Sequence, residues 1–202
     1  DRLLASDLPP VTQGWPIALS AEPRSTLGWL PSRDGRRILV VGAAGSGRTS
    51  TLRRFAWAHA ASGRPVAWVA GKGQPPSAPL PTLVTVVTPD APEPLVALRR
   101  RHPDLLVLVD DAELLRDTAV EPIVNEIARL VDRDDAAIVV AVDGSAPPQV
   151  RGLVPSIASY RCGLILQPGD RSAGDLLGLR RLEPLDGTPG RAYVVRHGHP
   201  IE

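Results

Sequence analysis

Three glycines lie close together between a hydrophobic segment and a segment with helical spacing. Residues 37–41 are predicted to form a strand, and Gly42, Gly45 and Gly47 follow it in one short loop. Glycine lets the backbone curl so that successive amide groups point inward, and the next helix adds its positive N-terminal end. Both features favour a bound phosphate group. The candidate nucleotide-binding residues are Gly42, Ala43, Ala44, Gly45, Ser46, Gly47, Arg48, Thr49 and Ser50.

Arg48 stands where the phosphate-loop pattern G-x-x-x-x-G-K-S/T has lysine. Both side chains are cationic, but a planar guanidinium is wider than the ammonium group that fits between the β- and γ-phosphates. Losing one charge-assisted hydrogen bond costs about 1.5–3 kcal/mol, which lowers nucleotide affinity about ten- to a hundred-fold. Thr49 keeps the hydroxyl that would hold Mg²⁺. The pattern predicts a weakened ATP–Mg²⁺ site, and the alternative is a glycine-rich turn that binds no ligand.

Two carboxylates follow a hydrophobic strand predicted at residues 105–109. Asp110 would orient the Mg²⁺ shell, and Asp111 would polarise the attacking water as the candidate catalytic residue. Most ring-type ATPases have glutamate at the second position, and the shorter aspartate can fall short of the water. The alternative is that both residues cap the next helix. The strand at 137–142 ends in Ala141-Val142, without the polar sensor that RecA-like motors usually place there. These departures argue against efficient hydrolysis.

Strands and helices alternate along the chain. The predicted strands are residues 37–41, 65–70, 82–87, 105–109, 137–142, 164–167 and 192–196, and the predicted helices are 47–61, 93–102 and 120–131. This alternation predicts an α/β fold with a mostly parallel sheet flanked by helices. Residues 72–81 are predicted to be a loop. Residues 1–35 are Pro-rich, with short apolar pieces at 15–19 and 27–30 that could be edge strands. We expect them to be a lead-in packed on a domain of residues 36–202.

Composition restricts the class of protein. The chain has 202 residues and a net charge of +1, which suits one domain with an extension and gives no overall attraction to nucleic acid. No apolar stretch is long enough to span a bilayer and no signal peptide is visible, so we expect a cytoplasmic protein without direct membrane insertion. The absence of Met suggests a fragment, whose parent protein can be anchored at the cell membrane. The single cysteine, Cys162, excludes an internal disulfide and is expected to be buried.

Other charged residues are weaker candidates for a site. The basic cluster at residues 99–101 ends a predicted helix, where a solvated face that complements the helix dipole is favoured over contact with nucleic acid or an acidic neighbour. His197 and His199 have no third ligand nearby in the sequence, which favours a hairpin turn over a metal site. Candidates for arginine fingers that reach the nucleotide of a neighbouring subunit are Arg161, Arg171 and Arg191.

Taken in order, these pieces resemble the FtsK/SpoIIIE family of P-loop ATPases, and especially the EccC-like proteins of type VII secretion. The resemblance lies in residues 42–49, in Asp110-Asp111, and in a C-terminal part similar to the family's closing segment, residues 161–168, 174–178 and 189–193. The SGRT sequence resembles the last, degenerate module of actinobacterial proteins that join several such domains. The resemblance implies a RecA-like P-loop NTPase fold, ATP and Mg²⁺ as ligands, and sister modules or a ring of subunits as partners. It also implies a protein substrate, and it is the only basis for DNA as a partner.

Several functions remain open from the sequence. One is a working ATPase module of a machine that moves DNA or secretes proteins. The favoured one is a degenerate module of such a translocase, with weak or absent hydrolysis because of Arg48, Asp111 and Ala141-Val142. The alternative is an inactive regulatory or substrate-docking domain that binds no nucleotide. A small-molecule kinase is less favoured, because the chain has no recognisable lid segment.

Overall fold

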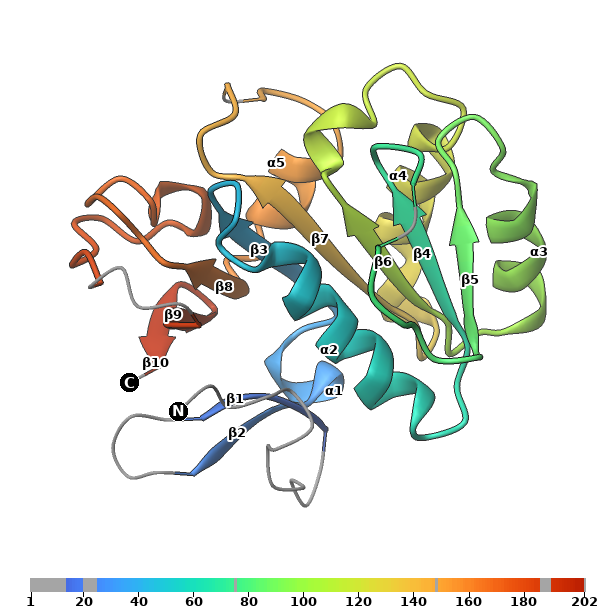
Figure 1. The fold of residues 1–202 in the computed structure, drawn as a ribbon, viewed down its shortest axis with the longest axis horizontal. Coiled ribbons are helices and arrows are strands. Elements are labelled where there is room, and N and C mark those ends of the chain that lie inside the picture. The colour runs from blue at the N-terminus through green and yellow to red at the C-terminus, as the bar shows by residue number, and fades with distance from the viewer. Residues whose placement is uncertain (1–13, 20–24, 75, 148, 186–189, 202) are drawn as a thin grey trace.

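The computed structural model describes residues 14–19, 25–74, 76–147, 149–185 and 190–201. Its main feature is an eight-stranded sheet with the order β10-β9-β8-β3-β7-β6-β4-β5 (Figure 1). The strands from β8 to β5 in this order are parallel, and β9 and β10 are antiparallel. The bounds are β3 Arg37–Gly42, β4 Val66–Ala70, β5 Val84–Val87, β6 Leu106–Asp110, β7 Ala137–Asp143, β8 Gly163–Leu166, β9 Ala192–Arg196 and β10 His199–Ile201.

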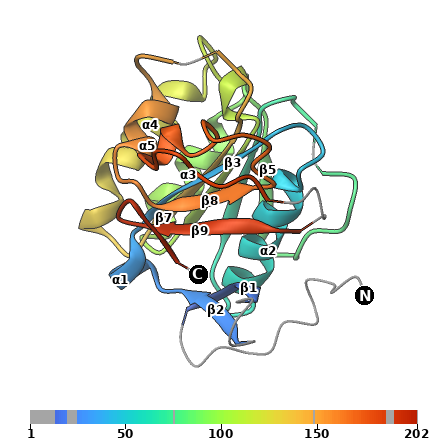
Figure 2. The same ribbon diagram turned by 90° about the vertical axis from the view of Figure 1, so that its left-hand side faces the viewer.

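Helices cover both faces of this sheet (Figures 1 and 2). Helix α2 (Arg48–Ala60) packs on one face, and α3 (Glu93–Arg101), α4 (Glu121–Leu130) and α5 (Leu153–Ala158) pack on the other. The central strands are buried along their whole length because helices shield both sides, as their continuous apolar sequences require. The fold is therefore the mostly parallel α/β architecture that the alternating pattern predicts, and it agrees with the RecA-like type that the resemblance implies.

The predicted elements agree with the structure to within a few residues, but some elements were missed. Helix α5 begins after Gly152 and contains Pro155, a composition typical of a loop. It is nonetheless helical because its apolar side chains reach the core. Strand β10 contains Pro200, which is compatible only with the edge position that it occupies. The turn between β9 and β10 contains His197 and Gly198, both with positive φ, so this segment is the hairpin turn that the sequence favoured.

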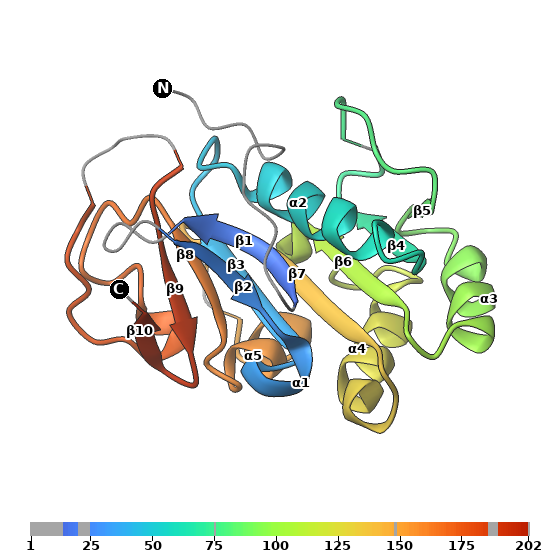
Figure 3. The ribbon, with the colours of Figure 1, turned by 90° about the horizontal axis from the view of Figure 1, so that it is seen from below.

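The N-terminal strands β1 (Trp15–Leu19) and β2 (Thr26–Trp29) form a separate antiparallel pair (Figure 3). Within the described residues they do not join the main sheet, so the expectation of edge strands was wrong about their place. They lie on α2 instead. The ring of Trp15 is 5.4 Å from that of Phe55 and 5.5 Å from that of His59, and Arg54 Nε donates to Pro16 O at 2.9 Å. The strand pair thus packs directly on the helix that follows the phosphate loop.

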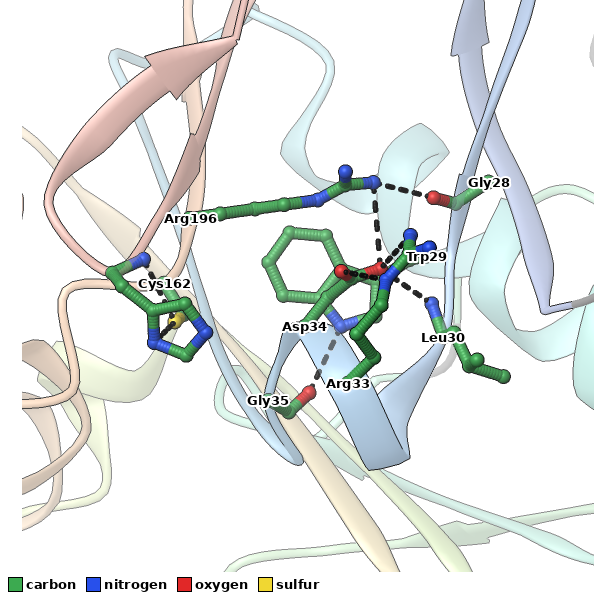
Figure 4. A network of polar contacts seen from close by, with 9 residues as sticks. Gly28, Trp29, Leu30, Arg33, Asp34, Gly35, Cys162 and Arg196 are labelled. Atoms are coloured by element: carbon green, nitrogen blue, oxygen red, sulfur yellow. Dashed lines mark hydrogen bonds and ion pairs between the residues drawn. The ribbon is translucent and has the colours of Figure 1, made fainter.

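A buried polar network joins this N-terminal segment to the C-terminal strands (Figure 4). Asp34, in the short helix α1 (Pro31–Asp34), is 3% exposed and accepts hydrogen bonds from the Leu30 amide and from Arg33. Arg196 of β9 lies 3.4 Å from the same carboxylate and also donates to Gly28 O at 2.6 Å. Trp29 donates its indole N–H to Gly35 O. Segments from opposite ends of the chain are therefore held together by charge and by packing.

Two further expectations concern the burial of Cys162 and the lack of a membrane-spanning segment. Cys162 is buried and unpaired, and burial raises the pKa of its thiol, which agrees with a structural role. Among the described residues, no helix combines the length and the apolar character that crossing a bilayer requires.

His59 makes the stability of this fold depend on pH. Its ring is 2% exposed and its Nε2 donates to Asp104 O, and burial lowers the pKa of its imidazole from 6.5 to about 4. Between these two values the unfolded chain binds more protons than the folded one, so stability falls as the pH drops. We expect the free energy of unfolding to fall by up to about 3 kcal/mol from pH 7 to pH 4 through this group.

Urea unfolding at pH 7 and at pH 5 measures this effect. His59→Gln should show a shallower loss of stability than the wild type, whereas His199→Gln, at an exposed position, should match the wild type. Equal pH dependence in the wild type and in His59→Gln would contradict the prediction.

Candidate functional site

The carboxyl ends of four parallel strands meet at one edge of the main sheet. Gly42 at the end of β3 is paired with Asp143 of β7, and Ala70 at the end of β4 is paired with Asp110 of β6. Ligands of open α/β sheets bind outside this edge, where the loops after the strands come together. All the residues that the sequence proposed for phosphate and Mg²⁺ lie here.

The glycine loop after β3 has the backbone that the spacing predicted. Gly45 and Gly47 have φ values of 80° and 100°, which side-chain-bearing residues rarely adopt, and a Cβ on Gly42 would lie 2.3 Å from Ser46 Oγ. The Ser46 amide closes the turn by donating to Ala43 O. Helix α2 then begins at Arg48, so its free amide groups and its positive end face the loop.

Thr49 and Asp110 lie together beside the loop. The Thr49 hydroxyl donates to Asp110 Oδ2 at 2.9 Å. Asp110 Oδ1 and Ser46 Oγ are buried and have no hydrogen-bond partner among the described residues. Burial raises the pKa of Asp110 despite the hydrogen bond from Thr49. Hydroxyl and carboxylate oxygens are suitable Mg²⁺ ligands, and an unsatisfied carboxylate oxygen would gain most from a cation. These residues fit Mg²⁺.

Among the described residues, no group of three or more His, Cys, Asp and Glu side chains is arranged to hold a metal ion by itself. That result is compatible with Mg²⁺ at Thr49 and Asp110, because Mg²⁺ usually takes one or two protein ligands and completes its shell with water and phosphate oxygens.

The guanidinium of Arg48 contacts carboxylates from two neighbouring strand ends. Its Nη2 lies 3.1 Å from Asp111 Oδ1 and 3.7 Å from Asp143 Oδ2, and its Nη1 lies 3.5 Å from Glu113 Oε1. The side chain is only 9% exposed. The sequence argument considered the width of Arg48 but not these partners. The carboxylate at the end of β7 was the available signal for Asp143, and Glu113 in the turn η2 (Ala112–Leu114) gave none.

Asp111 lies between two cations. One carboxylate oxygen contacts Arg48, and the other is 3.0 Å from Nζ of Lys72. The backbone of Asp111 is left-handed, with φ 51°, a conformation that non-glycine residues adopt mainly at special sites. An attacking water would have to compete with both ion pairs for these oxygens. The geometry therefore gives Asp111 a charge-pairing role in addition to its proposed role as a base.

Asp143 is held by its own loop. The Ser145 hydroxyl and amide both donate to Oδ1, and these hydrogen bonds lower the pKa of the carboxyl. The backbone amide of Asp143 donates to Glu113 Oε2 at 3.2 Å, and this hydrogen bond links the turn after β6 to the end of β7. Asp143 and Glu113 thus form one connected acidic group around Arg48.

The remaining candidates lie at several places in the fold. Ser50 is exposed on the first turn of α2. Arg161 precedes β8, at the edge of the sheet opposite to the phosphate loop, whereas Arg191 precedes the antiparallel β9 and its carbonyl accepts from the Gln167 amide near the phosphate-loop edge. Arg171 lies in the exposed loop that follows β8. Arg99, in the basic cluster at the end of α3, pairs with Asp134.

Comparison with known proteins supports the fold. No protein-family model and no curated protein matches this chain. Among solved structures, the cytoplasmic domain of EssC has a TM-score of 0.73 at 14% identity and covers 92% of this chain and 42% of its own. The cytoplasmic domain of the Thermomonospora curvata type VII secretion ATPase EccC has a TM-score of 0.68 at 19% identity, over 96% of this chain and 27% of its own.

A third structure contains ATPases 2 and 3 of T. curvata EccC in complex with a signal sequence peptide. It has a TM-score of 0.69 at 18% identity, over 96% of this chain and 41% of its own. This chain therefore spans less than half the length of these neighbours. It has the fold of the ATPase domains found in the EssC and EccC proteins of type VII secretion.

Proposed function

We propose that this chain is an ATP-binding module of a larger FtsK/SpoIIIE-like translocase, with weak or no hydrolysis of its own. The observation that carries the proposal is the Thr49–Asp110 pair beside the glycine loop, with buried oxygens that lack partners among the described residues. A glycine loop, a helix N-terminus and a Mg²⁺-type oxygen pair together match what a nucleoside triphosphate needs. The nucleotide-binding residues are then 42–50, with Thr49 and Asp110 as the Mg²⁺ ligands.

The proposal of weak hydrolysis rests on Asp111 and on the end of β7. Asp111 is engaged by the buried Arg48, and Ala141 and Val142, which precede Asp143 at the end of β7, have no side-chain group to position a water. General-base catalysis needs a free carboxylate oxygen within hydrogen-bond reach of the water. The phosphate loop by itself would bind the nucleotide, but it would not activate a water to attack the terminal phosphate.

Charge indicates how binding should depend on Mg²⁺. Two cations, Arg48 and Lys72, pair with the carboxylates of Asp111, Glu113 and Asp143, and the carboxylate of Asp110 adds a further negative charge beside Thr49. A triphosphate would add further negative charge, which only a divalent cation can offset at this distance. The same excess of carboxylates favours the alternative function, a docking or regulatory domain that binds no nucleotide.

Calorimetric titration of the wild type and of Arg48→Lys with ATP, with and without Mg²⁺, tests the proposal. We expect weak, Mg²⁺-dependent binding by the wild type and about ten- to a hundred-fold tighter binding by Arg48→Lys. The compact ammonium cannot reach all three carboxylates at once and is free to meet the phosphates. Turnover should stay far below the typical enzyme value of about 10 s⁻¹ in both proteins.

Arg133→Lys is the matched control, because residue 133 is exposed near the start of β7, at the opposite edge of the sheet. It should bind as the wild type does. If neither the wild type nor Arg48→Lys binds Mg-ATP at millimolar concentration, the alternative of an inactive docking domain replaces this proposal.

The wider setting is proposed from the structural neighbours. We propose that residues 36–202 form the ATPase-like domain, that residues 1–35 are its lead-in, and that the protein works in the cytoplasm. Sister modules or a protein substrate would be its partners, since the T. curvata EccC structure pairs ATPases 2 and 3 with a signal sequence peptide. The net charge of +1 gives no support to DNA as a ligand.

A further inference from the structure

Lys72 is the only lysine in the chain, and it lies at the candidate nucleotide site. It follows β4 in the turn Gly71-Lys72-Gly73, and its Nζ is 3.0 Å from Asp111 Oδ2. The side chain is 67% exposed, so the ammonium group can leave Asp111 without breaking any packing. A flexible cation therefore stands beside Asp111, at the strand ends that form the candidate site.

The turn that carries Lys72 is built against the acidic pair. The Gly71 amide donates to Asp110 O at 2.9 Å. A Cβ on Gly71 would lie 2.4 Å from Asp111 O and 2.6 Å from Asp110 O, closer than real Cβ atoms approach backbone atoms. Gly73, with φ 71°, closes the turn by donating to Ala70 O. A surface ion pair formed by chance would not need this close backbone approach, so the turn positions Lys72 over Asp111.

Arg48 and Lys72 differ in their freedom to meet a ligand. Arg48 is buried and contacts carboxylates of Asp111, Glu113 and Asp143. Among the described residues, Lys72 forms an ion pair with one carboxylate, that of Asp111, and its flexible stem carries a compact ammonium that fits between phosphates. The compact cation that a lysine at position 48 would supply is therefore available from the end of β4, which lies beside β6.

We propose that Lys72 determines the preference of this site for nucleoside triphosphate over diphosphate. In this role, Lys72 exchanges Asp111 for the terminal phosphate, while Arg48 stays with its carboxylates. A diphosphate lacks that phosphate and leaves Lys72 on Asp111. The inference rests on the proposed nucleotide binding and adds to it the residue that distinguishes a triphosphate from a diphosphate.

The first test is titration of the wild type, Lys72→Ala and the charge-matched control Arg133→Ala with Mg-ATP and Mg-ADP. We expect Lys72→Ala to lose about ten- to a hundred-fold in affinity for Mg-ATP, the value of one charged hydrogen bond. Its affinity for Mg-ADP should not change, and Arg133→Ala should behave as the wild type with both nucleotides. This result would show that the preference for triphosphate over diphosphate depends on Lys72.

The second test uses the fact that no other side chain in the protein is a primary amine. Acetylation with acetic anhydride should modify Lys72 and the N-terminal amine, which serves as an internal reference in the peptide masses. We expect Mg-ATP to slow modification of Lys72 but not of the N-terminus, and Mg-ADP to leave both rates unchanged.

Each outcome separates this inference from the proposed function. Equal losses of Mg-ATP and Mg-ADP affinity in Lys72→Ala, unchanged affinity for both, or equal binding of the two nucleotides by the wild type would overturn the role of Lys72 alone. Equal acetylation of Lys72 with either nucleotide would do the same. If the wild type binds neither nucleotide, the proposed function fails and the role of Lys72 fails with it.

Discussion

Replacing Trp29 with alanine is expected to lower the free energy of unfolding by about 3–5 kcal/mol, as for other buried tryptophans. Trp29 is fully buried in the core cluster that also contains Trp15 and Phe55. Its indole N–H donates to Gly35 O, and the guanidinium of Arg196 lies over its ring at 5.7 Å (Figure 4). Truncation would leave a cavity, an unpaired carbonyl and a loosened contact with β9.

Trp57→Ala is the matched control, because Trp57 is 47% exposed on α2. It should change stability much less than Trp29→Ala does when both are measured by urea unfolding. Comparable small losses in the two variants would show that the segment before residue 36 packs only loosely. Our proposal that residues 1–35 are an integral lead-in would then be wrong.

Replacing Arg48 with alanine should also destabilise the fold, by about 3 kcal/mol, because it removes the cation from a mostly buried acidic group. Asp111, Glu113 and Asp143 have side chains that are 12%, 16% and 21% exposed and lie within 3.7 Å of the guanidinium. Without Arg48, the exposed Lys72 is the one cation left in contact with Asp111 among the described residues. The pairs are partly shielded from water, so added salt should restore little of the loss.

The double variant Arg48→Ala/Asp111→Ala tests the origin of this loss. Removing both members of the pair should cost less than the sum of the two single changes, since neither charge is then left alone. Arg116→Ala is the control, because Arg116 is 79% exposed and 4.0 Å from Asp117, and it should cost less than about 1 kcal/mol. Additive losses in the double variant would mean that the carboxylates do not depend on Arg48.

These stability effects bear on the function of the site. An arginine that holds three carboxylates together serves the folded state, and a lysine at the same place would be freer to serve a phosphate. Lower stability in Arg48→Ala together with tighter Mg-ATP binding by Arg48→Lys would show that Arg48 stabilises the fold at the expense of nucleotide binding. It would also explain how a glycine loop can persist in a module with little activity.

Much of this fold follows from local sequence. The strands are continuous apolar runs, the helix after the glycine loop has apolar residues at helical spacing, and Gly45 and Gly47 are needed for positive φ wherever the chain goes next. These features act over a few residues, so the alternation of strands and helices and the place of the phosphate loop could be predicted. Thr49 and Asp110 could be paired because the carboxyl ends of parallel strands meet at one edge.

The partners of the charged residues could not be predicted in this way. Lys72, Glu113 and Asp143 come from three different loops, and their approach to Arg48 and Asp111 depends on the strand order β3-β7-β6-β4. The network of Asp34 with Arg196 likewise joins opposite ends of the chain. Electrostatic contacts act between groups that are close in space regardless of their separation in sequence. The sequence by itself determined which chemical groups stand at the ends of the strands, and only the tertiary structure decided which of them pair with one another and which are left for a ligand.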